Sequence, residues 1–260
     1  MADLRFQRWF TVGLLSLIAV LLVVSIAPYA ATWQRSVACE TQARDLMYQF
    51  VQAPAEVSRF DAAADALRTQ CPPPDEMAAG SWPILANLAV QLGNHAWGQQ
   101  AWDTAAMYYR LAIAYAPEQA PAHRRLAEVL LYHQQNPAEA LAQLDVAEVL
   151  DPHEAYTYML KAHSYAALNN LPRALEEAQR AVALANNSYG YLVQGDMLAN
   201  LDRWPEAIAS YERSIELDPN SAISFHQLGH ALRAVGQLEE AAAAWQQAQQ
   251  LDPSLSIPNP

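Results

Sequence analysis

Apolar positions beyond about residue 85 fall into short runs at helical spacing, and turn signals separate the runs. Three of these runs close on Leu-Asp-Pro, at Pro152, Pro219 and Pro253, and Pro117 closes another. Proline stops a helix and biases the preceding residue away from helical geometry. The pattern therefore predicts short helices and an all-α chain. Abundant alanine, scarce glycine and few β-branched residues in this region favour the same fold class.

The helical runs repeat with a period of 33 to 35 residues. One alanine near the start of each second helix keeps this spacing through five copies, at Ala105, Ala140, Ala174, Ala207 and Ala241. Self-similarity at such a period indicates an array of stacked helical hairpins.

The last copy, LGHALRAVGQLEEAAAAWQQAQQLDP, resembles the tetratricopeptide repeat pattern. In three copies, glycine stands where two helices must approach closely, and an aromatic residue of the second helix fills the adjacent space. These pairs are Gly93 with Tyr109, Gly195 with Tyr211, and Gly229 with Trp245. Glu128 and Ala162 occupy the glycine position in the second and third copies, and Asn186 replaces the closing proline of the third.

The resemblance covers five repeats, at about residues 86–119, 120–154, 155–187, 188–221 and 222–255, with a tail at 256–260. One hairpin cannot bury its apolar face alone, so the repeats are expected to stack into an α-solenoid. The first helices should form its concave face. The resemblance implies that an extended peptide or a partner helix binds along that face.

Projection onto the first helices predicts a partner-binding groove rich in tyrosine, histidine and apolar side chains, which suit recognition surfaces. Its members are Trp97, Arg125, Val129, Tyr132, His133, Tyr156, Met159, His163, Tyr189, Leu192, Asp196, Asn200, Ile223, His226, His230 and Arg233. The groove has no lysine ladder, so it does not resemble family members that clamp a C-terminal carboxylate.

Four groove residues raise a metal hypothesis. His163, Asp196 and His230 occupy equivalent positions in three successive first helices, and His226 lies one turn before His230. Two histidines at i, i+4 with a carboxylate can bind zinc or copper. A hydrogen-bonded polar strip that contacts a partner explains the same residues. We predict no cofactor and keep metal or small-ligand binding as an alternative.

The N-terminal region has a different pattern. No charged residue lies between Arg8 and Arg35, and about 20 apolar residues suffice to cross a bilayer as a helix. We predict a short cytoplasmic tail at 1–8 and a retained transmembrane helix at 9–34, rather than a cleaved signal peptide. Positive charge before the span favours a cytoplasmic N-terminus, with the repeats extracytoplasmic and periplasmic in a host with two membranes.

Residues 35–85 are predicted to form a helical hairpin followed by a proline-rich linker. Cys39 would open the first helix of this hairpin and Cys71 would close the second, which places both at the same end. A disulfide between them would require an oxidising compartment. Two unrelated buried thiols are the alternative.

Charge and motifs narrow the function further. The formal net charge is -12, Lys161 is the only lysine, and no basic cluster is visible, so we predict no nucleic-acid partner. No nucleophile elbow, phosphate-cradling glycine loop or His-Glu-x-x-His sequence occurs, so we predict no enzyme activity. We expect a membrane-anchored scaffold or accessory subunit that binds proteins, with lipid contact through residues 9–34. A periplasmic assembly factor or chaperone that engages translocated clients is the alternative.

Overall fold

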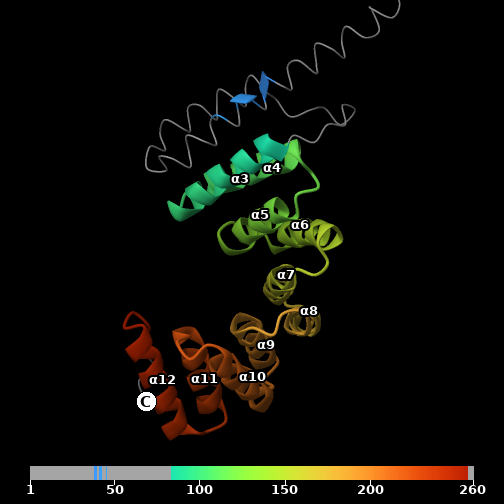
Figure 1. Cartoon of the computed structure of the whole chain (residues 1–260). Coiled ribbons are helices and arrows are strands. Elements are labelled where there is room, and N and C mark those ends of the chain that lie inside the picture. The colour runs from blue at the N-terminus through green and yellow to red at the C-terminus, as the bar shows by residue number, and fades with distance from the viewer. Residues whose placement is uncertain (1–37, 40, 43–44, 46–82, 257–260) are drawn as a thin grey trace, which may run out of the picture. The chain divides into compact units, whose positions relative to one another are not determined.

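A computed structural model describes residues 38, 39, 41, 42, 45 and 83–256 of the chain. Between residues 83 and 256 the structure contains ten helices and no strand (Figure 1). They are α3 (Pro83–Gly98), α4 (Trp102–Tyr115), α5 (Ala120–Tyr132), α6 (Pro137–Leu150), α7 (Ala155–Ala167), α8 (Leu171–Leu184), α9 (Ser188–Asn200), α10 (Trp204–Leu217), α11 (Ala222–Ala234) and α12 (Leu238–Leu251).

The chain divides into two compact units. The first includes 83–92 and 114–117, and the second includes 93–113 and 118–256, so the first predicted repeat contributes residues to both. In the first unit, Leu85, Leu88 and Ala89 are buried at helical spacing on α3.

In the second unit, helices α5 to α12 pair into hairpins and the hairpins stack. Each of α5, α7, α9 and α11 contacts the helix that follows it, and α6, α8 and α10 contact the start of the next hairpin. The first helices also contact one another in the order α5, α7, α9, α11. The predicted all-α solenoid of stacked hairpins is confirmed.

The glycine positions are as tight as predicted. A Cβ atom built on Gly195 would lie 2.4 Å from the Tyr211 ring, and one on Gly229 would lie 2.4 Å from the Trp245 ring. Gly93 stands in the same relation to Tyr109, at 2.5 Å. Any larger side chain would push the two helices apart. The five periodic alanines of the second helices are all buried.

The turn inside each hairpin contains one residue with positive φ. These residues are Gln100 (60°), Gln135 (50°), Asn169 (59°), Asp202 (57°) and Gly236 (84°). In four of the turns the next N–H donates to a carbonyl five residues earlier: Ala101 to Ala96, Asn170 to Tyr165, Arg203 to Leu198, and Gln237 to Leu232. This is the Schellman arrangement that ends a helix with a left-handed residue.

The Leu-Asp-Pro sequences mark the ends of second helices. The N–H groups of Asp151, Asp218 and Asp252 make a last helical bond, and the next residue, proline, has no N–H to continue it. The third hairpin ends similarly at Ala185 without a proline.

Several predictions fall outside the described residues. The tail at 1–8, the span at 9–34, the tail at 257–260 and nearly all of the hairpin and linker at 35–82 belong there. Among the described residues, no helix combines the length and apolar character needed to cross a membrane. Cys39 is buried, whereas Cys71 is outside the described residues, so their bridge stays a prediction.

Candidate partner-binding groove

The structure sorts the predicted groove residues by accessibility. Val129, Met159 and Leu192 are buried in the hydrophobic core of the second unit, because their side chains fill space between stacked hairpins. They therefore belong to the core and are not exposed members of the predicted groove. The exposed members are Arg125, Tyr132, His133, Tyr189, Asn200, Ile223 and Arg233. The half-buried members are Trp97, Tyr156, His163, Asp196, His226 and His230.

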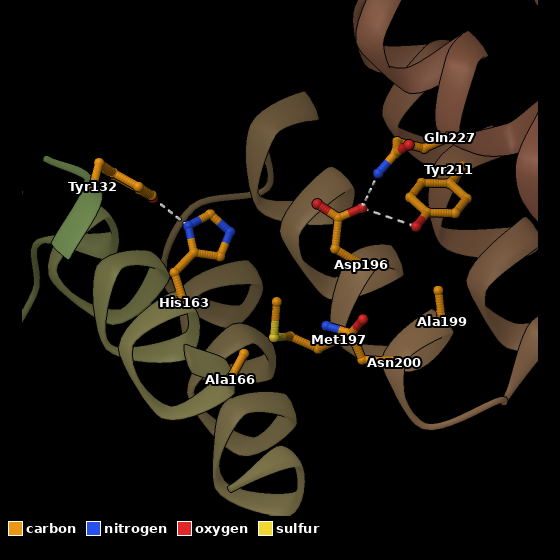
Figure 2. A pocket seen from close by; sticks show the side chains of 9 residues that line it. All are labelled: Tyr132, His163, Ala166, Asp196, Met197, Ala199, Asn200, Tyr211 and Gln227. Atoms are coloured by element: carbon orange, nitrogen blue, oxygen red, sulfur yellow. Dashed lines mark hydrogen bonds between the residues drawn. The ribbon is translucent and has the colours of Figure 1, made fainter. Parts of the chain in front are cut away.

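A pocket of about 410 Å³ opens among the first helices of the second unit (Figure 2). The C-terminal end of α5, helices α7 and α9, and single residues of α10 and α11 line it. The lining residues are Tyr132, His163, Ala166, Asp196, Met197, Ala199, Asn200, Tyr211 and Gln227. Sequence projection predicted four of the nine, Tyr132, His163, Asp196 and Asn200.

Asp196 carries the charge of this pocket. Its Oδ1 atom accepts hydrogen bonds from the Tyr211 hydroxyl at 2.9 Å and from Gln227 Nε2 at 3.0 Å. Neither donor is charged, and no ion pair among the described residues includes Asp196. Burial raises the pKa of the Asp196 carboxyl, and the two hydrogen bonds oppose that rise only in part.

His163 and Tyr132 form a neutral wall of the pocket. The Tyr132 hydroxyl is hydrogen-bonded to His163 Nδ1, and the two rings meet edge to face with centroids 5.9 Å apart. Burial lowers the pKa of His163, which keeps the imidazole neutral at physiological pH. Asp196 is therefore the one formally charged side chain among those that line the pocket.

Glu128 has partners that its sequence position did not reveal. It accepts hydrogen bonds from Arg125 Nη1 at 2.9 Å and from the Tyr156 hydroxyl at 2.7 Å. The Tyr156 ring in turn lies 6.5 Å from the Tyr189 ring, centroid to centroid. Glu128, at the glycine position, is thus connected through Tyr156 to the groove residue Tyr189. Arg125 balances the charge of Glu128.

Another aromatic cluster surrounds His133. Its ring stacks on Trp102 with centroids 3.5 Å apart and an interplanar angle of 5°, and Trp97 meets both rings edge to face. Trp102 was not predicted to belong to the groove. Its position at the start of the second helix, five residues after Trp97, is the sequence feature that could have indicated its contact with Trp97.

The metal hypothesis gains no geometric support. His226 and His230 lie with ring centroids 4.6 Å apart, and His230 contacts Trp245. His163 and Asp196 line the pocket, whereas these two histidines do not. In the part of the chain that the structure describes, no group of three or more His, Cys, Asp or Glu residues could hold a metal ion.

Models of the tetratricopeptide repeat match three segments of the chain, at residues 90–155, 195–234 and 222–255. These segments, which form stacked hairpins in the structure, are therefore similar to the tetratricopeptide repeat. The resemblance predicted from the sequence is thereby confirmed.

Solved structures share the fold at low identity. MamA protein is 19% identical with a TM-score of 0.52, covering 67% of this chain and 98% of that one. PilW, described as a widely conserved type IV pilus biogenesis factor, is 20% identical with a TM-score of 0.61, covering 66% and 80%. The pilF protein of Pseudomonas aeruginosa is 17% identical with a TM-score of 0.61, covering 85% and 95%. No curated protein matches this chain significantly.

Proposed function

We propose that this chain is a scaffold, or an accessory subunit of a membrane complex, that binds protein partners along the first helices of its second unit. The observation that carries the proposal is a set of exposed large side chains on three of the first helices, α5, α9 and α11. Tyr132 on α5, Tyr189 on α9 (42% exposed) and Ile223 on α11 (57% exposed) belong to it. Tyr132 also lines the pocket at Asp196, and exposed aromatic and apolar groups are typical of protein recognition surfaces.

Photo-crosslinking in the native host tests the groove. A photoreactive amino acid at Tyr189 or Ile223 should give discrete crosslinked partner bands. Val149 on α6, which is 83% exposed on a second helix, is the matched control site and should give none. Equal bands at Val149, or no band at either groove position, would contradict the proposal.

Co-purification decides between a subunit and an assembly factor. A scaffold or accessory subunit retains one partner in stoichiometric amount through mild detergent and high salt, as expected for a large, obligate interface. Many substoichiometric clients would indicate the assembly factor or chaperone instead.

The membrane part of the proposal has a separate basis and a separate test. It rests on the uncharged stretch at 9–34. Residues 9–34 would anchor the chain, with the repeats extracytoplasmic. Carbonate washing should leave the full chain in the membrane and release a variant without residues 1–34. A mature polypeptide that begins near Thr32 would overturn the anchor but not the groove.

A further inference from the structure

We propose that the pocket at Asp196 receives the ammonium group of a lysine side chain, presented by an extended segment of the protein partner. This inference rests on the proposed function, because the pocket opens among the same first helices. It adds the chemical class of the group that the groove recognises.

Within the described part of the chain, no cation balances the negative charge of Asp196. Largely buried carboxylates are ordinarily paired with a cation, since burial without a partner disfavours the charged form. Glu128 follows this rule through Arg125. Among the described residues, Asp196 has only the Tyr211 hydroxyl and the Gln227 amide as hydrogen-bond donors, and both bond the same oxygen, Oδ1. The second oxygen, Oδ2, is left for a ligand, and Figure 2 shows it directed away from both donors.

Of the two strongly basic side chains, lysine fits the free oxygen of Asp196 better than arginine does. An arginine fork binds a carboxylate through both oxygens, and Oδ1 already accepts two bonds. An ammonium group is a compact charge that needs only one oxygen, so Oδ2 suits lysine better. The side chains of Tyr132 and His163 bring no competing positive charge, and a pocket of about 410 Å³ is in the range of known ligand sites.

The charge of Asp196 can be removed without damaging the fold. In Asp196→Asn, the amide oxygen can still accept the bonds from Tyr211 and Gln227, while the amide nitrogen takes the place of the open oxygen. Asp202→Asn is the matched control. Asp202 is exposed in the turn between α9 and α10 at φ 57°, which asparagine tolerates. Both substitutions change the net charge equally.

The experiment uses two pools of blocked nonapeptides with mixed uncharged sequences. The central residue is lysine in one pool and Nε-acetyl-lysine in the other. Each pool is passed over the immobilised full chain, and the retained peptide is measured by mass spectrometry. We expect the wild type and Asp202→Asn to retain the lysine pool about tenfold better, and Asp196→Asn to lose that preference, as for one charge-assisted hydrogen bond.

Two results would overturn the inference. One is equal retention of the two pools by the wild type, including the case in which neither is retained. The other is a lysine preference that Asp196→Asn leaves intact. Neither result touches the proposed function, which depends on the crosslinks at Tyr189 and Ile223.

Discussion

Lys161 and Asp196 are charged residues of the second unit, the first buried and the second half-buried, and their partners differ. Lys161 of α7 is 4% exposed, and its Nζ lies 2.5 Å from Glu148, 2.8 Å from Asp145 and 3.8 Å from Glu177. Asp196 of α9 has two neutral donors and, within the described part of the chain, no cationic partner. One charge is surrounded by opposite charge, whereas the other is open to a pocket.

The pKa shifts of Lys161 and Asp196 differ in the same way. Burial acts to lower the pKa of Lys161, but hydrogen bonds to Asp145 and Glu148 outweigh it and the pKa is raised. Burial raises the pKa of Asp196, and its neutral partners do not offset this. Each carboxyl near Lys161 supports the charge that folding buries there. At Asp196 folding leaves the charge poorly supported, which is typical of sites built for a ligand rather than for stability.

Removal of Lys161 should have the largest effect. Lys161→Met would leave Glu148 and Glu177 with Arg180 as their remaining cation, at 2.7 and 3.1 Å. Breaking a buried ion cluster from one side typically costs about 3 kcal/mol. We expect a loss of this size in urea unfolding monitored by circular dichroism.

The exposed pair of Arg110 and Glu139 provides the control. Arg110→Met should cost under about 1 kcal/mol, because solvent already screens this pair. Equal losses of unfolding free energy for Lys161→Met and Arg110→Met would mean that burial does not strengthen the contribution of Lys161.

Overpacking at Gly195 tests the packing of Tyr211, the tyrosine that is hydrogen-bonded to Asp196. Gly195→Ala places a methyl group 2.4 Å from Tyr211, whose hydroxyl holds Asp196. Overpacking costs more than the gain in helix propensity returns, so we expect a net loss of about 1–2 kcal/mol. Gly98→Ala, with no atom within 4 Å of the new methyl group, should show no loss in the same thermal melts. A neutral Gly195→Ala would show that the ring moves without cost.

Asp196→Asn should stabilise the chain at neutral pH, by about 1 kcal/mol, a common desolvation penalty for a buried polar group. An acid whose pKa is raised on folding makes the folded state less stable as pH rises above the ordinary value of 3.8. The gain should therefore vanish when the pH falls below about 4. Melting temperatures of both proteins from pH 3 to 7 check this. A destabilised variant at pH 7 would indicate an ionic partner for Asp196.

The smallest effect is expected at His163. Its pKa is lowered on folding, so the unfolded chain binds a proton first and stability falls as pH drops below 6.5. His163→Gln should reduce this fall by less than about 1 kcal/mol between pH 6.5 and 5. Parallel stability curves for the two proteins would contradict the burial of a neutral imidazole.

Sequence reasoning predicted the repeating architecture because each element rests on local contacts. Gly195 and Tyr211 lie 16 positions apart within one hairpin, and the same spacing recurs at Gly93 and Gly229. Such a signal repeats in the sequence and can be recognised there. The alanines that recur in the second helices can be recognised for the same reason, because they lie where the two helices of a hairpin pack closely.

The site was less predictable because it depends on contacts between hairpins. Helical projection places Met159 and Leu192 on the groove face. It does not show how deeply each side chain lies between neighbouring first helices, and both of these are buried there. The pairing state of Asp196 depends on Gln227, which is 31 positions away. Nothing in a single sequence shows that a glutamine rather than a cation reaches it.

The hairpin turns have a practical consequence. Four of the five left-handed residues are not glycine, and all four side chains are exposed. A left-handed backbone costs a glutamine about 1–2 kcal/mol, part of which glycine would recover, whereas asparagine and aspartate tolerate it better. Gln100→Gly or Gln135→Gly would thus strengthen a chosen repeat while leaving every groove side chain unchanged. Such variants would differ in the stability of single repeats. Their partner affinities would show which hairpin must change conformation when a partner binds.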